Sequence, residues 1–88
     1  MPIPKNIKKE HVLKAIIKIQ HEGLPIRSKP RKFAVKYEGL DLPCKLLISW
    51  ANIFANGEEL DLNPNNFQTY MAKEYLAMLG FEIVKINK

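Results

Sequence analysis

The sequence predicts a single α+β domain in which three helices pack against a three-stranded antiparallel sheet. Its 88 residues suffice for one hydrophobic core and leave no room for a second. Its composition, 47% hydrophobic and 26% charged, is that of an ordinary folded protein. Apolar residues recur at helical spacing in three segments and follow strand-like patterns in three others, which predicts the order α-β-β-α-α-β for one domain over residues 1–88.

The first segments are predicted to be an extended arm and an amphipathic helix. Two prolines keep residues 1–6 out of a helix. Over about residues 8–22 apolar side chains recur three and four positions apart, and Gly23 followed by Pro25 ends the pattern. The residues expected on the inner face of this helix are Val12, Leu13, Ile16, Ile17 and Ile19.

A hairpin and a second helix are expected next. Apolar residues alternate over 33–37, and Glu38-Gly39 can turn the chain into a strand at 40–42. Pro43 suits the first turn of a helix, and Asn56-Gly57 would end it. Because apolar residues cover more than one face of this helix, we expect it to be central. Its residues expected in the core include Trp50 and Phe54.

A third helix and a last strand complete the prediction. An acidic connection over residues 58–66, anchored by Leu60 and Leu62, leads to a helix over about residues 68–79 that Gly80 closes. We expect residues 81–86 to pair with the hairpin, because that pairing would satisfy their backbone groups. The residues expected to face inward from the third helix are Tyr70 or Met71, Tyr75, Met78 and Leu79.

Several classes of protein are disfavoured by the residue counts. The one cysteine, Cys44, cannot form an internal disulfide, and with His11 and His21 it does not make a zinc-ligand set. No apolar run approaches the roughly 20 residues that cross a bilayer, and the N-terminus lacks the apolar stretch of a signal peptide. We therefore expect a cytoplasmic protein with no metal, no cofactor and no membrane partner.

Catalysis is not expected either. The two histidines are ten positions apart on one predicted helix, about 15 Å along its axis, which is too far to share a reacting atom. The acidic residues 58–61 lack the spacing of a calcium loop, and the isolated glycines form no phosphate-binding loop. Cys44, near a helix start and beside Lys45, could be an activated thiol, although burial is the favoured interpretation.

Positive charge is concentrated in the first part of the chain. The net charge is +5, yet residues 1–36 hold ten basic and two acidic residues, whereas residues 37–80 hold two basic and six acidic ones. A basic segment that follows the first helix is the best candidate for binding phosphates, with a merely solvated loop as the alternative. The residues of this basic segment are Arg27, Lys29, Arg31 and Lys32. The outer candidates are Lys14, Lys18 and Lys45.

Short motifs along almost the whole chain carry a resemblance to a known family. Among them are Ile3-Pro4-Lys5-Asn6-Ile7, Glu22-Gly23-Leu24-Pro25, Pro43-Cys44-Lys45 and Ala55-Asn56-Gly57-Glu58-Glu59-Leu60. Together they resemble the small N-terminal head domain of McrA-like, modification-dependent restriction endonucleases. The resemblance implies a non-catalytic module that recognises or positions DNA ahead of an HNH nuclease or an McrB-type GTPase. The chain departs from the family pattern at residues 42–45 and 65–69.

These observations lead to two hypotheses. In the first, the domain binds DNA, duplex before single-stranded and with or without a modified base, through the basic segment and the basic face of the first helix. It requires these cations to gather on one surface and to stay unpaired by the carboxylates of the middle section. In the second, it is an adaptor whose acidic segment 58–61 or exposed aromatic residues dock a nuclease or other defence partner.

Overall fold

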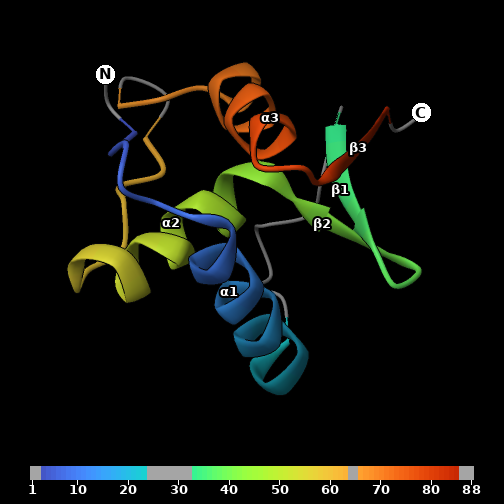
Figure 1. Ribbon diagram of the computed structural model, residues 1–88, viewed down its shortest axis with the longest axis horizontal. Coiled ribbons are helices and arrows are strands. Elements are labelled where there is room, and N and C mark those ends of the chain that lie inside the picture. The colour runs from blue at the N-terminus through green and yellow to red at the C-terminus, as the bar shows by residue number, and fades with distance from the viewer. Residues whose placement is uncertain (1–2, 24–32, 64–65, 86–88) are drawn as a thin grey trace.

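The computed structural model describes residues 3–23, 33–63 and 66–85. The predicted order of elements is confirmed (Figure 1). The elements are α1 (Lys9–Glu22), β1 (Phe33–Tyr37), β2 (Leu40–Pro43), α2 (Cys44–Asn56), α3 (Thr69–Met78) and β3 (Glu82–Lys85).

The three strands form an antiparallel sheet in the order β2-β1-β3. Val35 on the central strand lies opposite Leu42 on β2 and Ile83 on β3, and this row faces the helices. The predicted pairing of the last strand with the hairpin is therefore confirmed. On the other face Ala34 is also buried, because its small side chain lies between Pro43 and Val84 on the flanking strands.

The hairpin turn is made by the dipeptide that the sequence indicated. Glu38 and Gly39 both have positive φ, 50° and 81°. Two successive residues of this kind characterise the turn whose twist matches that of antiparallel strands. Glycine adopts positive φ readily, whereas the Cβ atom of Glu38 makes this conformation energetically unfavourable.

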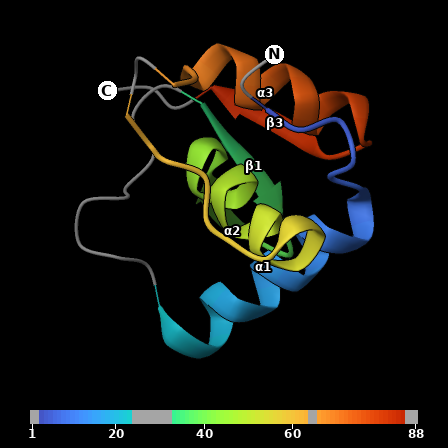
Figure 2. The same ribbon diagram turned by 90° about the vertical axis from the view of Figure 1, so that its left-hand side faces the viewer.

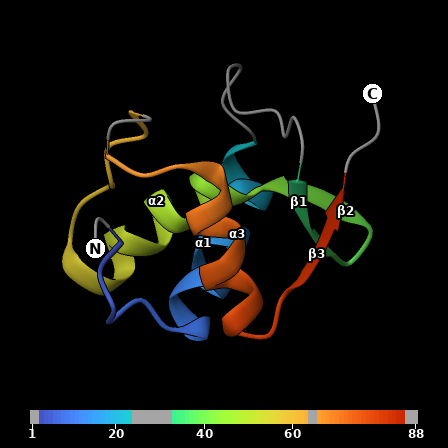
Figure 3. The ribbon, with the colours of Figure 1, turned by 90° about the horizontal axis from the view of Figure 1, so that it is seen from above.

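The second helix is central, as expected. α2 lies between α1 and α3, and the three helices lie to one side of the sheet (Figures 2 and 3). Pro43 ends β2 and caps the helix rather than occupying its first turn, and Gly57, with φ of 92°, closes it. Cys44 and every residue from Leu46 to Asn52 are buried, which shows that α2 is covered on all sides up to Asn52.

Some apolar residues predicted to lie inside are exposed to solvent. Ile17 on α1, Phe54 on α2 and Met78 on α3 are 52%, 40% and 70% exposed. Leu62 is exposed as well, and of the alternatives Tyr70 and Met71 it is Met71 that packs against the core. In α3 the buried stripe is made of Ala72, Tyr75 and Leu76. Since this short helix carries apolar residues on more than one side, those outside the stripe remain in water.

The N-terminal arm belongs to the core. Ile3 and Ile7 are each only 1% exposed, and the hydroxyl of Tyr75 donates a 2.7 Å hydrogen bond to the carbonyl of Ile7. Asn6 and Asn56 exchange side-chain amide hydrogen bonds of 2.6 and 3.0 Å. The arm is therefore held at both α2 and α3.

A stripe of polar side chains on α2 holds the segment that follows the helix. Asn52, Ser49 and Lys45 donate in turn to the carbonyls of Glu58, Leu60 and Leu62, at 2.8, 2.7 and 2.6 Å. The acceptors are alternate residues of an extended segment that runs back along the helix. Residues 58–62, predicted as a turn-rich connection, are thus fixed to α2 by side chains rather than by a strand partner.

Candidate nucleic-acid interface

The predicted phosphate-binding residues fall into two groups. Arg27, Lys29, Arg31 and Lys32 lie outside the described residues. Lys14, Lys18 and Lys45 are described. The structure brings Lys14 and Lys18 together on one side of α1 and places Lys45 at a different location, on the first turn of α2.

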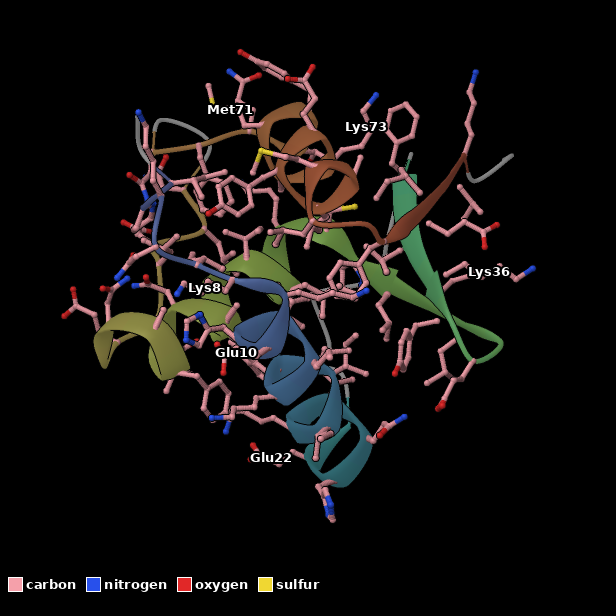
Figure 4. The ribbon with its side chains drawn as sticks, viewed as in Figure 1. Lys8, Glu10, Glu22, Lys36, Met71 and Lys73 are labelled. Carbon is pink, nitrogen blue, oxygen red and sulfur yellow. The ribbon has the colours of Figure 1, made fainter. Side chains whose placement is uncertain are left out.

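Lys14 and Lys18 border a shallow, open depression of about 370 Å³ between α1 and α2. The depression is largely apolar, with polar groups around it. Its lining residues are Lys14, Ile17, Lys18, His21, Glu22 and Phe54. All but Phe54 belong to α1, between Lys14 and the last helical residue, Glu22, which is labelled at the lower end of the helix in Figure 4.

Two large hydrophobic side chains supply the apolar surface of the depression. Ile17 is 52% exposed and Phe54 is 40% exposed. Ile17 lies on the helix face opposite the buried residues Val12 and Ile19, so its exposure follows from a 3.6-residue period. No such signal identifies Phe54, because Trp50, one turn earlier on α2, is buried.

Lys18 is fixed in place by two contacts. Its Nζ lies 2.7 Å from a carboxylate oxygen of Glu22, one turn further along α1, and 5.0 Å from the ring centroid of Trp50. Both contacts are attractive, since a carboxylate and an indole face each attract a cation. Lys18 and Glu22 therefore form a neutral, ordered pair at the edge of the depression.

Lys14 and His21 are exposed beside this pair. The structure shows no ion pair of Lys14 with any other described residue. His11, by contrast, has a structural role at the start of α1, where its Nδ1 accepts a 2.9 Å hydrogen bond from the backbone N–H of Lys8. That bond satisfies one of the backbone donors that a helix start leaves unpaired.

Lys45 has a structural role in addition to its predicted one. Its Nζ donates to the carbonyl of Leu62 and lies 4.9 Å from the ring centroid of Phe67. Burial lowers the pKa of Lys45, and the nearby charge of Asp61 acts in the opposite direction. Its ammonium group is thus engaged by the segment that α2 holds.

None of the described carboxylates of the middle section forms an ion pair with a lysine of the first helix. Among the described residues, Lys18 and Glu22 form the one ion pair within 4.0 Å. Glu59 instead accepts a 3.0 Å hydrogen bond from the indole N–H of Trp50, and Asp61 accepts one from the backbone N–H of Asn63. The segregation of charge along the sequence therefore persists in the fold over this part of the chain.

The structure also shows the environment of Cys44, the one cysteine of the sequence. Cys44 is 2% exposed, and burial raises its thiol pKa to about 11, which removes the reason to regard it as a nucleophile. No group of three or more metal-ligating side chains comes together within residues 3–23, 33–63 and 66–85. None of the helices described is both long and apolar enough to cross a membrane.

Comparison with protein-family models, curated proteins and solved structures found no match for this chain. The resemblance to the head domain of modification-dependent restriction endonucleases therefore stays a prediction from its motifs.

Proposed function

We propose that this domain binds nucleic acid without catalysing a reaction. The contacts would be made to phosphates, by the outward face of α1 and by the basic residues 27–32 that follow it in sequence. The observation that carries the proposal is that Lys14, exposed on α1, forms no ion pair with any described carboxylate, those of the acidic middle section included. A cation that is free of carboxylates can release counterions from a phosphate backbone, which is the main source of affinity for nucleic acids.

Two features support DNA as the partner. The motif resemblance implies a DNA-recognising module, and duplex DNA, plain or modified, is the first ligand to test. The depression adds exposed apolar surface beside Lys14 and His21, a combination of cations and hydrophobic groups that nucleic-acid-binding surfaces use for backbone and base contacts together.

Salt dependence of binding tests this proposal. Fluorescence anisotropy titrations with a labelled duplex should give an affinity that falls with a slope of about −0.9 per phosphate neutralised. Lys14→Ala should reduce that slope by about one unit, and Arg27→Ala combined with Arg31→Ala by about two.

Lys36→Ala is the matched control, since it removes the same charge from an exposed lysine that projects from the sheet, away from α1 (Figure 4). It should leave the slope unchanged. Slopes that are equal in all three variants and the parent protein would refute the proposed surface.

An adaptor function is the second candidate, and one observation favours it. Tyr70 and Met78 are 50% and 70% exposed on α3, on the far side of α2 from the depression. If low-salt titrations detect neither duplex nor single-strand binding while a defence nuclease co-purifies with the domain, the adaptor function replaces nucleic-acid binding.

A further inference from the structure

We propose that the depression between α1 and α2 seats an unpaired nucleobase, so that the domain prefers single-stranded nucleic acid to a duplex of the same length. This inference rests on the nucleic-acid binding proposed above and specifies its ligand. The base would lie against Phe54 and Ile17, and the adjoining phosphate would contact Lys14.

The apolar surface of the depression suits the face of a base. Phe54 presents a partly exposed aromatic ring, and Ile17 extends the same surface from the neighbouring helix. Every base has a π face, so stacking on an aromatic side chain requires no particular sequence. Lys14 and Lys18 line the same depression, and the side chain of lysine carries an apolar stem below its ammonium group.

The charge at the edge of the depression is complementary to a phosphate. The one carboxylate in the lining, that of Glu22, is neutralised by Lys18 at 2.7 Å. Lys14 is therefore the lining residue whose positive charge no carboxylate of the depression neutralises, and His21 lines the same depression. An anionic backbone can approach here without meeting an unpaired acidic side chain.

The width of the surface argues against base contacts within a duplex. The major groove of B-DNA is about 12 Å wide and admits one helix. The depression, however, is built by two packed helices, whose axes lie about 8–10 Å apart and which together span roughly 20 Å. Phe54 on α2 cannot follow α1 into the groove, and the faces of paired bases are covered by their neighbours. Only a base outside a helical stack can reach this surface.

The test compares a labelled 12-nucleotide oligo(dT) with a 12-base-pair duplex in anisotropy titrations at two salt concentrations. Phe54→Leu keeps an apolar side chain and removes the ring, and it should weaken binding of the single strand by about 5- to 150-fold, the value of one base–aromatic stack. Its effect on duplex binding should stay within about twofold. Phe54→Tyr keeps the ring and should retain affinity for the single strand.

Tyr70→Leu is the matched control, because it removes a comparably exposed ring from α3. It should leave both affinities unchanged. The inference is overturned, with the proposed function intact, if the duplex binds as well as the single strand or if Phe54→Leu behaves like Tyr70→Leu. If the domain binds neither the single strand nor the duplex, the inference and the proposed function are both overturned. If it then binds an acidic peptide, the depression is assigned to a protein partner.

Discussion

The hydroxyl of Ser49 donates a 2.7 Å hydrogen bond to the carbonyl of Leu60, and the backbone N–H of Leu60 returns a 3.3 Å bond to the carbonyl of Ser49. Ser49 is completely buried, on the central helix of the domain. Together with the bonds from Lys45 and Asn52, this pair fixes the acidic segment to α2.

Ser49→Ala should lower the free energy of unfolding by about 1–2 kcal/mol, because it leaves the Leu60 carbonyl without its donor in a partly buried place. For a domain of this size the melting temperature should fall by about 4–16 °C. Thermal unfolding followed by circular dichroism measures the change. Gln20→Ala, on the exposed side of α1, is the control, and equal melting temperatures for the two variants would contradict the stabilising role of the pair.

Glu38→Asn should stabilise the hairpin by about 0.5–1 kcal/mol. Glu38 has φ of 50°, a conformation that asparagine tolerates better, and Asn-Gly is the preferred pair for this turn. Chemical denaturation gives the free energy. Asp41→Asn removes a carboxylate from the same hairpin at a residue without positive φ and should not stabilise it in the same way. Equal gains in both variants would assign the effect to charge instead.

Cys44 should react slowly in the native protein. A thiol pKa raised from 9.0 to about 11 leaves roughly 100-fold less thiolate near pH 8, and burial restricts access further. Alkylation by iodoacetamide at pH 8 should therefore be at least 100-fold slower than in urea. A native rate equal to the unfolded rate would restore the hypothesis of an activated thiol.

The same shift has a consequence for stability at high pH. Because the folded state holds the thiol proton more tightly, the unfolded state loses it first as the pH rises. Stability should therefore decline between about pH 9 and pH 11, and Cys44→Ser should show a smaller decline over that range in urea titrations.

Tyr75→Phe should cost about 1 kcal/mol, since it removes the buried hydroxyl that bonds to the carbonyl of Ile7. Tyr70→Phe deletes an exposed hydroxyl and should be neutral. Hydrogen exchange adds a local readout, in which the backbone amides of Ile3 and of residues 5–7 should exchange faster in Tyr75→Phe alone. Unchanged exchange there would show that side-chain burial holds the arm without the hydrogen bond.

Local sequence signals predicted the elements and much of the core. The helical spacing of Val12, Ile16 and Ile19 and the turn at Glu38-Gly39 depend on neighbours within a few positions, and both are confirmed. The sequence could also predict that Lys14 and Lys18 lie on the same face of α1, because residues four positions apart are neighbours on a helix surface.

Features that depend on tertiary packing had no such signal. Phe54 is exposed although Trp50, one turn earlier on the same helix, is buried, and the carbonyls of residues 58–62 accept from side chains up to 17 positions away. The candidate site needs both helices, so its phosphate-binding half could be predicted from the sequence and its base-stacking half could not.

The hydrogen bond between the hydroxyl of Tyr75 and the carbonyl of Ile7 joins positions 68 apart in the sequence. The part of the chain between these two residues contains α1, the hairpin and α2. A label or fused module placed ahead of Ile3 is consequently anchored to the body of the protein through the arm, at α2 and at α3. Force applied through such a fusion would act on the bonds between Asn6 and Asn56 and on the bond between Ile7 and Tyr75 before it reached α1.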